Sequence, residues 1–557
     1  MNYKEKYNDW LNNKNISKEI KQILNDMDED EIREAFSNDL EFNTAGARGI
    51  MGIGSGYLNE FTIRKINYGL YNYFSKYYPG YLDKGIVIGY DNRNNSKEFA
   101  NMCAAFFTSR GIKVYMSLDL MPTPLVSHTI LNKNLLGGIN ITASHNPKEY
   151  NGYKVYNSYG YQFSLSEANL LIDEMSKISI DLMFEKKEKI NHENLIILKE
   201  EFANSYFEKI KASRLNPSLD KEDFKIVYTP LHGSGLKGVR HVLETSGYNL
   251  SVVKEQSTYD KEFVNTSSLN PEDLNAYDMA INLAKSIDAD IVLATDPDAD
   301  RIGVCIKKEG DYHLLNGNEI GSLLIYYLLT NKKDLKDGKI ITTIVTSTLG
   351  EKIADDFNVE TIYTLTGFKF IGELMSKNKF KNFILGYEES NGYLVNDLAR
   401  DKDAISASLM ISEMALFFKL KGLDLIDVLE SLYERYGYHL NLTKAYTFEG
   451  NNGLIKMNQI ITKLRNLDIH EIGGYKVVFK EDYLTSRRYS KENYKPLDLP
   501  ISNVLKLIFE DKSYIAIRPS GTEPKLKVYY NIIEDNKKNA SSKLEAFKSY
   551  IDKVLNN

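Results

Sequence analysis

The sequence predicts an α/β protein of several domains, and three observations support this fold class. At 557 residues the chain is too long for one hydrophobic core, because cores stop growing at roughly 250 to 300 residues. Hydrophobic residues make up 43% and charged residues 26%, the balance of a globular protein. Short apolar runs rich in β-branched residues alternate with amphipathic stretches, which is typical of strand–helix units. We expect three α/β domains followed by a smaller α+β domain.

The elements are expected in the following order. Residues 1–40 alternate charged and apolar positions in a helical manner and are predicted to be a helical lead-in. The strand–helix pattern starts with GIVIGYD at 85–91 and a helix-like stretch at 96–111 that Gly111 closes. Further strands are expected at 137–142, 224–229, 289–295, 339–347 and 383–388.

Past about residue 450 the pattern changes to that of a small α+β domain. A helix is expected at 452–467, strands near YKVVFKE and SYIAIRPSG, and a final helix up to about residue 555. The predicted domains therefore span residues 1–40, 41–210, 211–325, 326–445 and 446–557.

Charge and composition exclude several classes of protein. A net charge of −6 gives no general attraction to nucleic acid or to anionic lipid, so neither is an expected partner. Cys103 and Cys305 form neither a CxxC pair nor a disulfide framework, which favours a reducing compartment. The N-terminus is polar, and no apolar run approaches the roughly 20 residues that span a bilayer. We expect a cytoplasmic protein.

The segment ITASHNPKEYNGYKVY at 141–156 places Ser144 where a predicted strand gives way to a polar loop. Ligands gather at the carboxyl ends of strands in α/β domains, so this position suits a nucleophile. Ser, Asn and Pro are also common turn formers, and on this segment alone a turn is the better interpretation.

The segment ATDPDADRIG at 294–303 carries Asp296, Asp298 and Asp300 after another apolar strand. Alternate residues of an extended segment point to the same side, so the three carboxylates could converge on one hard cation. An EF-hand loop is excluded, since Arg301 and Lys307 stand where it needs Gly and Glu. A solvated acidic turn is the alternative, but three like charges after a buried strand repel one another unless a cation is bound.

Other loops carry weaker signals. IRPSGTEPKLK at 517–527 gathers an arginine, two hydroxyls and a glycine, a composition that can cradle a phosphate but also occurs without a ligand. GYEESNGYLV at 386–395 contains Glu388 and Ser390, which could bind sugar hydroxyls or simply lie on the surface. The Gly-rich stretch at 43–57 presents Arg48 but lacks the nucleotide P-loop pattern. His232 is expected to be structural.

Five of these segments, in this order along the chain, resemble the α-D-phosphohexomutase family of phosphoglucomutases and phosphomannomutases. They are the Arg48 loop, TASHNP around Ser144, DPDADR at 296–301, GYEES at 386–390 and RPSGTEPK at 518–525. Together with TGFKFIG at 366–372, these details look most like the branch that contains phosphoglucomutase 2 and related bacterial enzymes. The resemblance implies three similar α/β domains with mixed sheets and a smaller C-terminal domain around a central cleft.

The resemblance also implies roles for individual residues. Ser144 corresponds to the phosphorylated nucleophile, and together with Asp296, Asp298 and Asp300 it would contact one Mg²⁺ per chain. Lys154 corresponds to the proposed general acid or base, with His145 beside it, or else it is a counter-charge for phosphate. The residues implied in binding phosphate and sugar are Arg48, Arg301, Lys369, Glu388, Ser390, Arg518, Ser520, Gly521 and Thr522.

The implied reaction interconverts sugar 1-phosphates and 6-phosphates through a bisphosphate intermediate, with glucose 1,6-bisphosphate as activator. Glucose phosphate is the expected substrate, and mannose or pentose phosphates are the alternatives within the same chemistry. A catalytically silent relative that binds sugar phosphates, and a phosphatase with an aspartate nucleophile, are the alternatives outside it. The oligomeric state, monomer or dimer, stays open.

Overall fold

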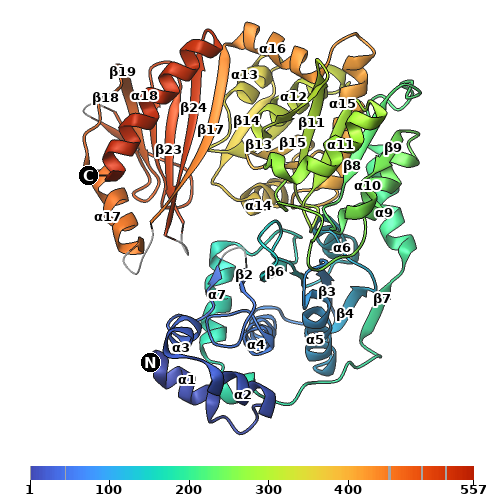
Figure 1. The fold of residues 1–557 in the computed structure, drawn as a ribbon, viewed down its shortest axis with the longest axis vertical. Helices are drawn as coiled ribbons and strands as arrows, with labels where there is room; N and C mark the ends of the chain where they lie inside the picture. The colour runs from blue at the N-terminus through green and yellow to red at the C-terminus, as the bar shows by residue number, and fades with distance from the viewer. Residues whose placement is uncertain (1, 44–45, 449–452, 491–492, 521–523, 557) are drawn as a thin grey trace. The chain divides into compact units, whose positions relative to one another are not determined.

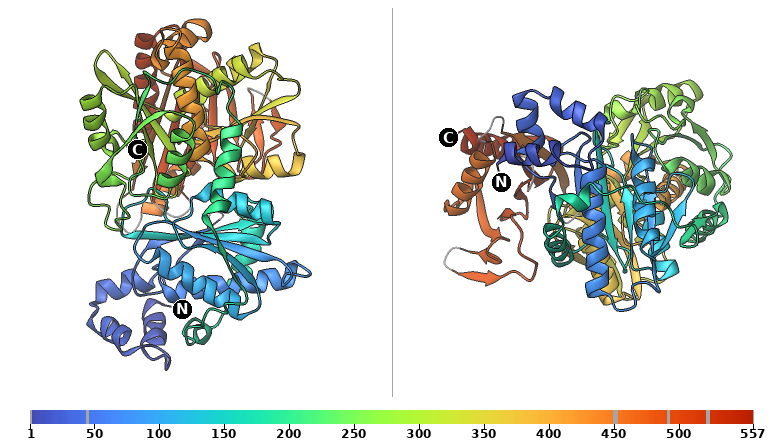
Figure 2. Two further views of the ribbon diagram at one scale, coloured as in Figure 1. Left: turned by 90° about the vertical axis from the view of Figure 1, so that its right-hand side faces the viewer. Right: turned by 90° about the horizontal axis from the view of Figure 1, so that it is seen from below.

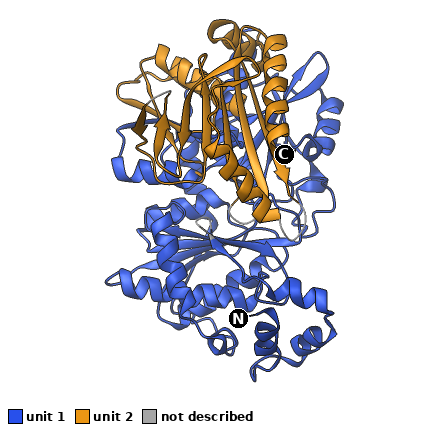
Figure 3. Cartoon of the chain, turned by 90° about the vertical axis from the view of Figure 1, so that its left-hand side faces the viewer, with its two compact units in different colours: residues 1–317, 368–421 blue, residues 318–367, 422–557 orange. Residues whose placement is uncertain are grey.

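The computed structural model describes residues 2–43, 46–448, 453–490, 493–520 and 524–556. They form two compact units (Figure 3), each built from helices and strands. The first unit comprises Met1–Gly317 and Phe368–Lys421, and the second comprises Asn318–Gly367 and Gly422–Asn557.

The first unit holds most of the helices and strands in Figure 1. Its helices are α1 (Tyr3–Leu11), α2 (Lys18–Asp26), α3 (Glu29–Phe36), α4 (Glu60–Tyr77), α5 (Ser96–Ser109), α6 (Thr123–Lys133), α7 (Leu165–Ser176), α8 (Ile180–Met183), α9 (Glu200–Ala212), α10 (Gly235–Glu244), α11 (Asp278–Ile287), α14 (Phe368–Asn378) and α15 (Ala404–Lys419). Its strands are β1 (Phe42–Asn43), β2 (Gly46–Ile50), β3 (Gly85–Tyr90), β4 (Lys113–Ser117), β5 (Gly137–Ile141), β6 (Tyr150–Asn157), β7 (Leu195–Leu198), β8 (Lys225–Thr229), β9 (Asn249–Val252), β10 (Ile291–Thr295), β11 (Ile302–Lys308), β12 (Asp311–Leu315), β15 (Asn382–Glu388) and β16 (Gly392–Leu394).

A seven-stranded mixed sheet of order β1-β2-β6-β5-β3-β4-β7 forms the first part of this unit. Strand β3 runs parallel to β4 and β5, whereas β6 is antiparallel to both β2 and β5. Every residue of β3 and β5 is buried, which explains why both read as continuous apolar runs. Because β3 and β5 are parallel neighbours, the loops after them leave the same edge of the sheet.

A five-stranded sheet of order β12-β11-β10-β8-β9 follows in the same unit. Strand β10 pairs in parallel with β8 and antiparallel with β11. Its five residues are all buried, and the chain turns directly after Thr295 to enter β11. The acidic segment 296–300 is this turn.

The N-terminal lead-in is helical, as the sequence predicts, and its three helices lie beside α4 (Figure 2). Trp10 of α1 and Phe36 of α3 are buried together with Phe61 of α4 and Phe184. The lead-in therefore shares a hydrophobic cluster with the first α/β layer.

The second unit combines a parallel strand pair with a larger antiparallel sheet. Its elements are α12 (Gly317–Asn331), β13 (Gly338–Thr343), α13 (Leu349–Asp356), β14 (Glu360–Thr364), α16 (Leu425–Tyr436), β17 (Tyr438–Thr447), α17 (Gly453–Asn466), β18 (Glu471–Ile472), β19 (Tyr475–Asp482), β20 (Arg487–Tyr489), β21 (Tyr494–Pro496), β22 (Leu505–Phe509), β23 (Tyr514–Pro519), β24 (Lys525–Glu534) and α18 (Lys537–Asn556). Strands β13 and β14 are parallel. The antiparallel sheet has the order β17-β24-β23-β22-β19-β20-β21, with β18 beside β19, and it buries its core against α17 and α18.

The strand predicted at 339–347 is shorter than expected. It ends at Thr343, whose carbonyl oxygen accepts hydrogen bonds from the backbone N–H and the hydroxyl of Thr346. This hydroxyl-capped turn competes with strand pairing. In the described ranges no helix is both long and apolar enough to cross a membrane.

Candidate active site

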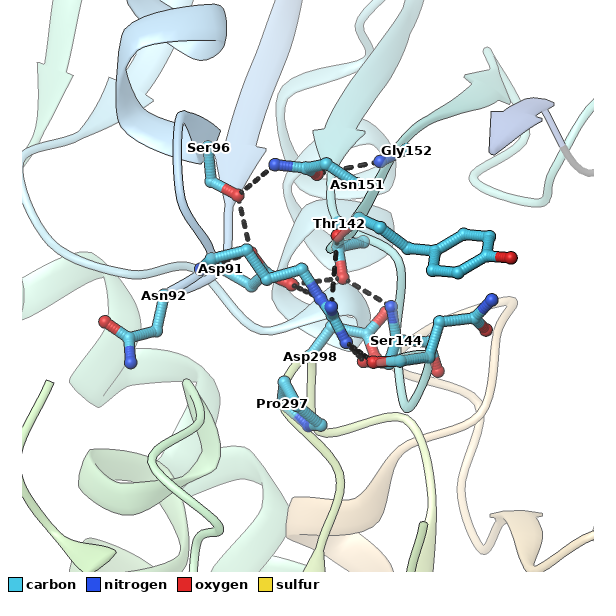
Figure 4. Close-up of polar contacts among 12 residues, drawn as sticks. Asp91, Asn92, Ser96, Thr142, Ser144, Asn151, Gly152, Pro297 and Asp298 are labelled. Atoms are coloured by element: carbon cyan, nitrogen blue, oxygen red, sulfur yellow. Dashed lines mark hydrogen bonds and ion pairs between the residues drawn. The ribbon is translucent and has the colours of Figure 1, made fainter. Parts of the chain in front are cut away.

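Ser144 lies in the loop between β5 and β6 with only 3% of its surface exposed. Its φ of 53° falls in the left-handed region, which costs a residue with a Cβ about 1–3 kcal/mol. The Ser144 N–H donates to Oγ1 of Thr142 at 2.9 Å, and Arg93 donates to the Ser144 carbonyl oxygen at 2.5 Å (Figure 4). Hydrogen bonds on both sides of the residue therefore hold it in a strained conformation.

The three aspartates after β10 occupy a tight turn, and the expected extended geometry is wrong. The carbonyl oxygen of Asp296 accepts from the N–H of Ala299 at 2.9 Å, and the Asp296 N–H donates to the Arg301 carbonyl oxygen at 3.3 Å. Ala299 has a φ of 53°, which closes the turn. The turn, rather than the alternation of a strand, brings the carboxylates together.

The carboxylates of Asp296, Asp298 and Asp300 form a buried cluster. Each offers one oxygen atom, and these atoms all lie within 4.8 Å of one another. Oδ1 of Asp298 and Oδ1 of Asp300 are buried without a hydrogen-bond partner among the described residues. Burial, together with the charges of Asp300 and Asp298, raises the pKa of Asp296 well above its ordinary value. Buried acceptors that lack donors fit a hard cation with oxygen ligands such as Mg²⁺.

The Ser144 hydroxyl lies at the edge of this cluster. Its Oγ donates to Oδ2 of Asp296 at 2.7 Å and lies 3.2 Å from Nδ1 of His145. Two segments about 150 residues apart in the chain are thus in direct contact. The serine hydroxyl and the candidate metal ligands share one buried site.

Two lysines balance the charge of the aspartates. Lys154 of β6 donates to Oδ2 of Asp298 at 2.5 Å and to Oδ2 of Asp300 at 3.0 Å. Lys402, just before α15, lies 3.3 Å from Asp300 and 3.4 Å from Asp401. Burial alone would lower the pKa of Lys154, but Asp298 and Asp300 outweigh it and raise that pKa. This charge environment favours the protonated form of Lys154, which is the form that can donate a proton.

The same lysines also lower the pKa of one of the aspartates, Asp300. Burial opposes ionisation of Asp300, but Lys154, Lys402 and Arg301 hold the pKa of Asp300 below its ordinary value. Asp300 is therefore ionised inside the protein, as a metal ligand must be.

The two predicted arginines come from segments that contact the Ser144 loop or the aspartate turn. Arg48 of β2 donates from Nη1 to Oδ1 of Asn146, two residues after Ser144, at 2.8 Å. Arg301 donates its N–H to Oδ1 of Asp296 at 3.0 Å and its guanidinium to Glu272 at 2.6 Å. Both guanidinium groups come from segments that contact the Ser144 cluster.

Glu388 ends β15 and is buried, and its charge contributes to the raised pKa of Lys402. Lys402 passes so close to Gly392 that a Cβ there would lie 2.1 Å from Cδ of the lysine. Glycine at 392 therefore leaves room for the lysine to reach the aspartates. Ser390 lies in the turn between β15 and β16, and Lys369 lies in the first turn of α14, both in the first unit.

The predicted phosphate loop belongs to the second unit. Arg518 lies near the end of β23, and the Ser520 N–H donates to the Lys525 carbonyl oxygen at 2.7 Å. Gly521 and Thr522 lie outside the described residues. The phosphate-binding role of these four residues stays a prediction.

Several residues of the site were not found from the sequence. Arg93 and Asp91 follow β3, and Thr123 begins α6 with its hydroxyl 2.9 Å from Oδ2 of Asp298. Lys402 follows the segment that contains Glu388. The polar run DNRNNS at 91–96, directly after β3, was the available signal, since it too stands at the carboxyl end of a strand.

Four family models match the chain in sequence order. They describe the phosphoglucomutase/phosphomannomutase alpha/beta/alpha domains I, II and III and the C-terminal domain. The residues matched are 39–180, 204–310, 316–436 and 458–540.

Curated relatives match over nearly the full length. The chain is 37% identical over 546 residues to a phosphoglucomutase of Staphylococcus aureus strain USA300, covering 96% of this chain and 97% of that one. It is 36% identical over 558 residues to a phosphoglucomutase of Staphylococcus saprophyticus, with 98% and 99% covered.

Solved structures show the same fold at low sequence identity. A phosphoglucomutase/phosphomannomutase family protein of Burkholderia thailandensis aligns with a TM-score of 0.68 at 17% identity, covering 92% of this chain and 97% of that one. The pp63/parafusin phosphoglucomutase of Paramecium, in an open form, gives 0.66 at 17% identity, with 92% and 95% covered.

Proposed function

Because this chain belongs to the phosphoglucomutase/phosphomannomutase family and is a phosphohexomutase, we propose that it interconverts α-D-glucose 1-phosphate and glucose 6-phosphate through a phosphoserine at Ser144. One observation carries the proposal. The Ser144 hydroxyl lies 2.7 Å from Asp296 within a buried trio of carboxylates. The full-length relatives named phosphoglucomutase support glucose as the sugar.

The proposed reaction has two phosphoryl transfers. In the first, the P–O bond to Ser144 breaks and a P–O bond to the free hydroxyl of the bound sugar phosphate forms, giving glucose 1,6-bisphosphate and a free serine. The proton released by the sugar hydroxyl ends on the serine oxygen. In the second, the bisphosphate binds in the opposite orientation and returns its other phosphoryl group to Ser144. The net change is the position of one phosphate.

The side chains around Ser144 are proposed to serve these transfers. Lys154 is the candidate for the group that donates a proton to the departing serine oxygen and regains one from the sugar hydroxyl, and His145 lies against the serine hydroxyl. Arg48 and Arg301 supply fixed positive charge for the phosphoryl oxygens. Asp296, Asp298 and Asp300 would hold one Mg²⁺ together with the serine oxygen. When bound, that ion offsets negative charge on the phosphoryl group in transfer.

Recognition of the sugar phosphate is proposed to use further loops of the chain. Lys369, Glu388 and Ser390 would contact the sugar and its phosphate. The clamp for the phosphate that does not react would comprise Arg518, Ser520, Gly521 and Thr522. Glucose 1,6-bisphosphate would act as an activator, because it can phosphorylate an enzyme that has lost its phosphate.

Steady-state rates on glucose 1-phosphate, mannose 1-phosphate and ribose 1-phosphate test the choice of sugar. We expect the highest kcat/KM for glucose 1-phosphate and no turnover of any of the three by the Ser144→Ala variant. A clear preference for ribose 1-phosphate would replace this proposal with a phosphopentomutase.

A further inference from the structure

The loop that carries Ser144 is held by one buried arginine, Arg93, whose side chain has no solvent exposure. Arg93 follows β3, and the Ser144 loop follows the neighbouring parallel strand β5. The guanidinium donates to four carbonyl oxygens of that loop: from Nη2 to Ser144 and Asn146, both at 2.5 Å, and from Nη1 to Pro147 at 2.7 Å and Tyr150 at 3.1 Å.

A buried carboxylate, Asp91, links this arginine to the other side of Ser144. Its Oδ2 lies 3.3 Å from Nε of Arg93 and accepts from the Thr142 hydroxyl at 2.6 Å. The same hydroxyl oxygen accepts from the Ser144 N–H at 2.9 Å. Arg93, Asp91, Thr142 and Ser144 thus form a closed ring of contacts that holds both the N–H and the carbonyl oxygen of Ser144. Figure 4 labels Asp91, Thr142 and Ser144 and draws the hydrogen bonds between them.

We propose that Arg93 is a positioning residue for phosphoryl transfer, which holds Ser144 in its left-handed conformation so that Oγ faces Asp296. The inference rests on the proposed function, since it takes Ser144 as the nucleophile. A serine at φ 53° would relax toward the common backbone regions if the loop carbonyl oxygens lost their donors. The hydroxyl would then move away from the carboxylate trio.

The geometry distinguishes positioning from direct contact with the substrate. A guanidinium has five N–H groups, and the two Nη atoms of Arg93, which carry four of them, donate to the four carbonyl oxygens. The fifth, on Nε, is buried and lies 3.3 Å from Asp91 as an ion pair. The Nη groups that could grip a phosphate are therefore already engaged by the loop. A lysine at this position keeps the charge but donates from one atom only, so it cannot reach carbonyl oxygens spread over seven residues of loop.

The Arg93→Lys variant tests the proposal, with Arg64→Lys as the matched control. Arg64 is also buried, in α4, and donates from Nη1 to two backbone carbonyl oxygens, those of Met183 and Glu185. Single-turnover transfer from the phosphoenzyme to glucose 1-phosphate would be measured, together with KM, thermal unfolding and the ³¹P resonance of the phosphoserine.

We expect Arg93→Lys to slow the transfer by about 10²-fold, the scale of a misplaced reacting group, with KM changed less than about threefold. Its phosphoserine resonance should shift or broaden. Arg64→Lys should transfer phosphate at close to the wild-type rate, whatever its unfolding temperature. A transfer rate of Arg93→Lys within about threefold of wild type, or a loss confined to KM, would overturn the proposal.

A second variant covers the case in which Arg93→Lys does not fold. Thr142→Val keeps the shape of the side chain but removes both hydrogen bonds of the hydroxyl, to Asp91 and from the Ser144 N–H. It should slow transfer by about tenfold, which corresponds to roughly 1.4 kcal/mol. An unchanged rate of phosphoryl transfer in Thr142→Val would refute the proposal that this ring positions Ser144. Wild-type protein that carries no phosphate on Ser144 would instead refute the proposed function, and the inference with it.

Discussion

Individual carboxylates determine the charge of the candidate site. Three of them meet in a turn after β10, and two of their oxygens are buried without a donor among the described residues. Lys154 and Lys402 neutralise part of the negative charge of these carboxylates through ion pairs. An additional cation is the simplest way to satisfy the remaining oxygens, because unpaired buried charge is expensive.

Removal of one of these carboxylates should weaken metal binding. We expect Asp298→Ala to bind Mg²⁺ more than about 10-fold less tightly than wild type, since even partners of metal ligands contribute that much. Isothermal titration calorimetry measures the affinity. Asp311→Ala is the control, because Asp311 belongs to the same sheet but has 75% of its side chain exposed. Equal affinities for Asp298→Ala and wild type would contradict the assignment of the site.

The sequence predicted which residues would form the candidate site but not how they are held. Ser144 and the aspartates could be found because each follows an apolar strand, where ligands gather. The turn at 296–300 could not, because it depends on a positive φ at Ala299, a residue type that rarely adopts one. The role of Arg93 was missed because its partners are backbone carbonyl oxygens, which the polar run around it does not identify.

Among the elements, the N-terminal helices belong to the folded core rather than to an appendage. Trp10 has 2% of its surface exposed and meets the rings of Phe36, Phe61 and Phe184 edge-on, with centroids 5.5, 5.3 and 5.1 Å away. Edge-to-face contacts at these distances are favourable beyond the area they bury. The helices should therefore stabilise the layer formed by α4.

We expect Trp10→Ala to lower the free energy of unfolding of the N-terminal helices and the α4 layer by about 3–5 kcal/mol, the usual effect of removing a large buried ring. For a domain of this size the calorimetric transition should move down by roughly 6 °C or more. Ile23→Ala on α2 is the control, because Ile23 is 46% exposed and should change little. A transition of Trp10→Ala that coincides with wild type would show that the lead-in does not support the core.

Buried strands could be predicted from the sequence more accurately than exposed ones. Buried strands such as β3, β5 and β10 were found within two residues of their bounds, because a strand buried on both faces is apolar along most of its length. Strand β20 and the edge strand β21 were not expected, since all three residues of β21 face solvent and show no alternation. Pairing with a neighbouring strand, which sequence composition does not record, decides such elements.

At the scale of the whole molecule, residues from distant matched segments meet in one unit. Ser144 comes from the first family domain, Asp296 from the second and Lys402 from the third. Arg518 comes from the C-terminal domain and belongs to the second unit. This division explains why no single segment revealed the function. The Ser144 segment alone indicated a turn, and its interpretation as the loop of a nucleophile depended on carboxylates about 150 residues further along the chain.

The central claim is that the transferred phosphoryl group passes through Ser144. Peptide-mapping mass spectrometry of the protein, first incubated with glucose 1,6-bisphosphate and then with excess glucose 1-phosphate, tests it most directly. We predict phosphate on the peptide that contains Ser144 after the first step, its loss after the second, and none on that peptide in Ser144→Ala. Phosphate found only on another residue, or full turnover by Ser144→Ala, would contradict the account.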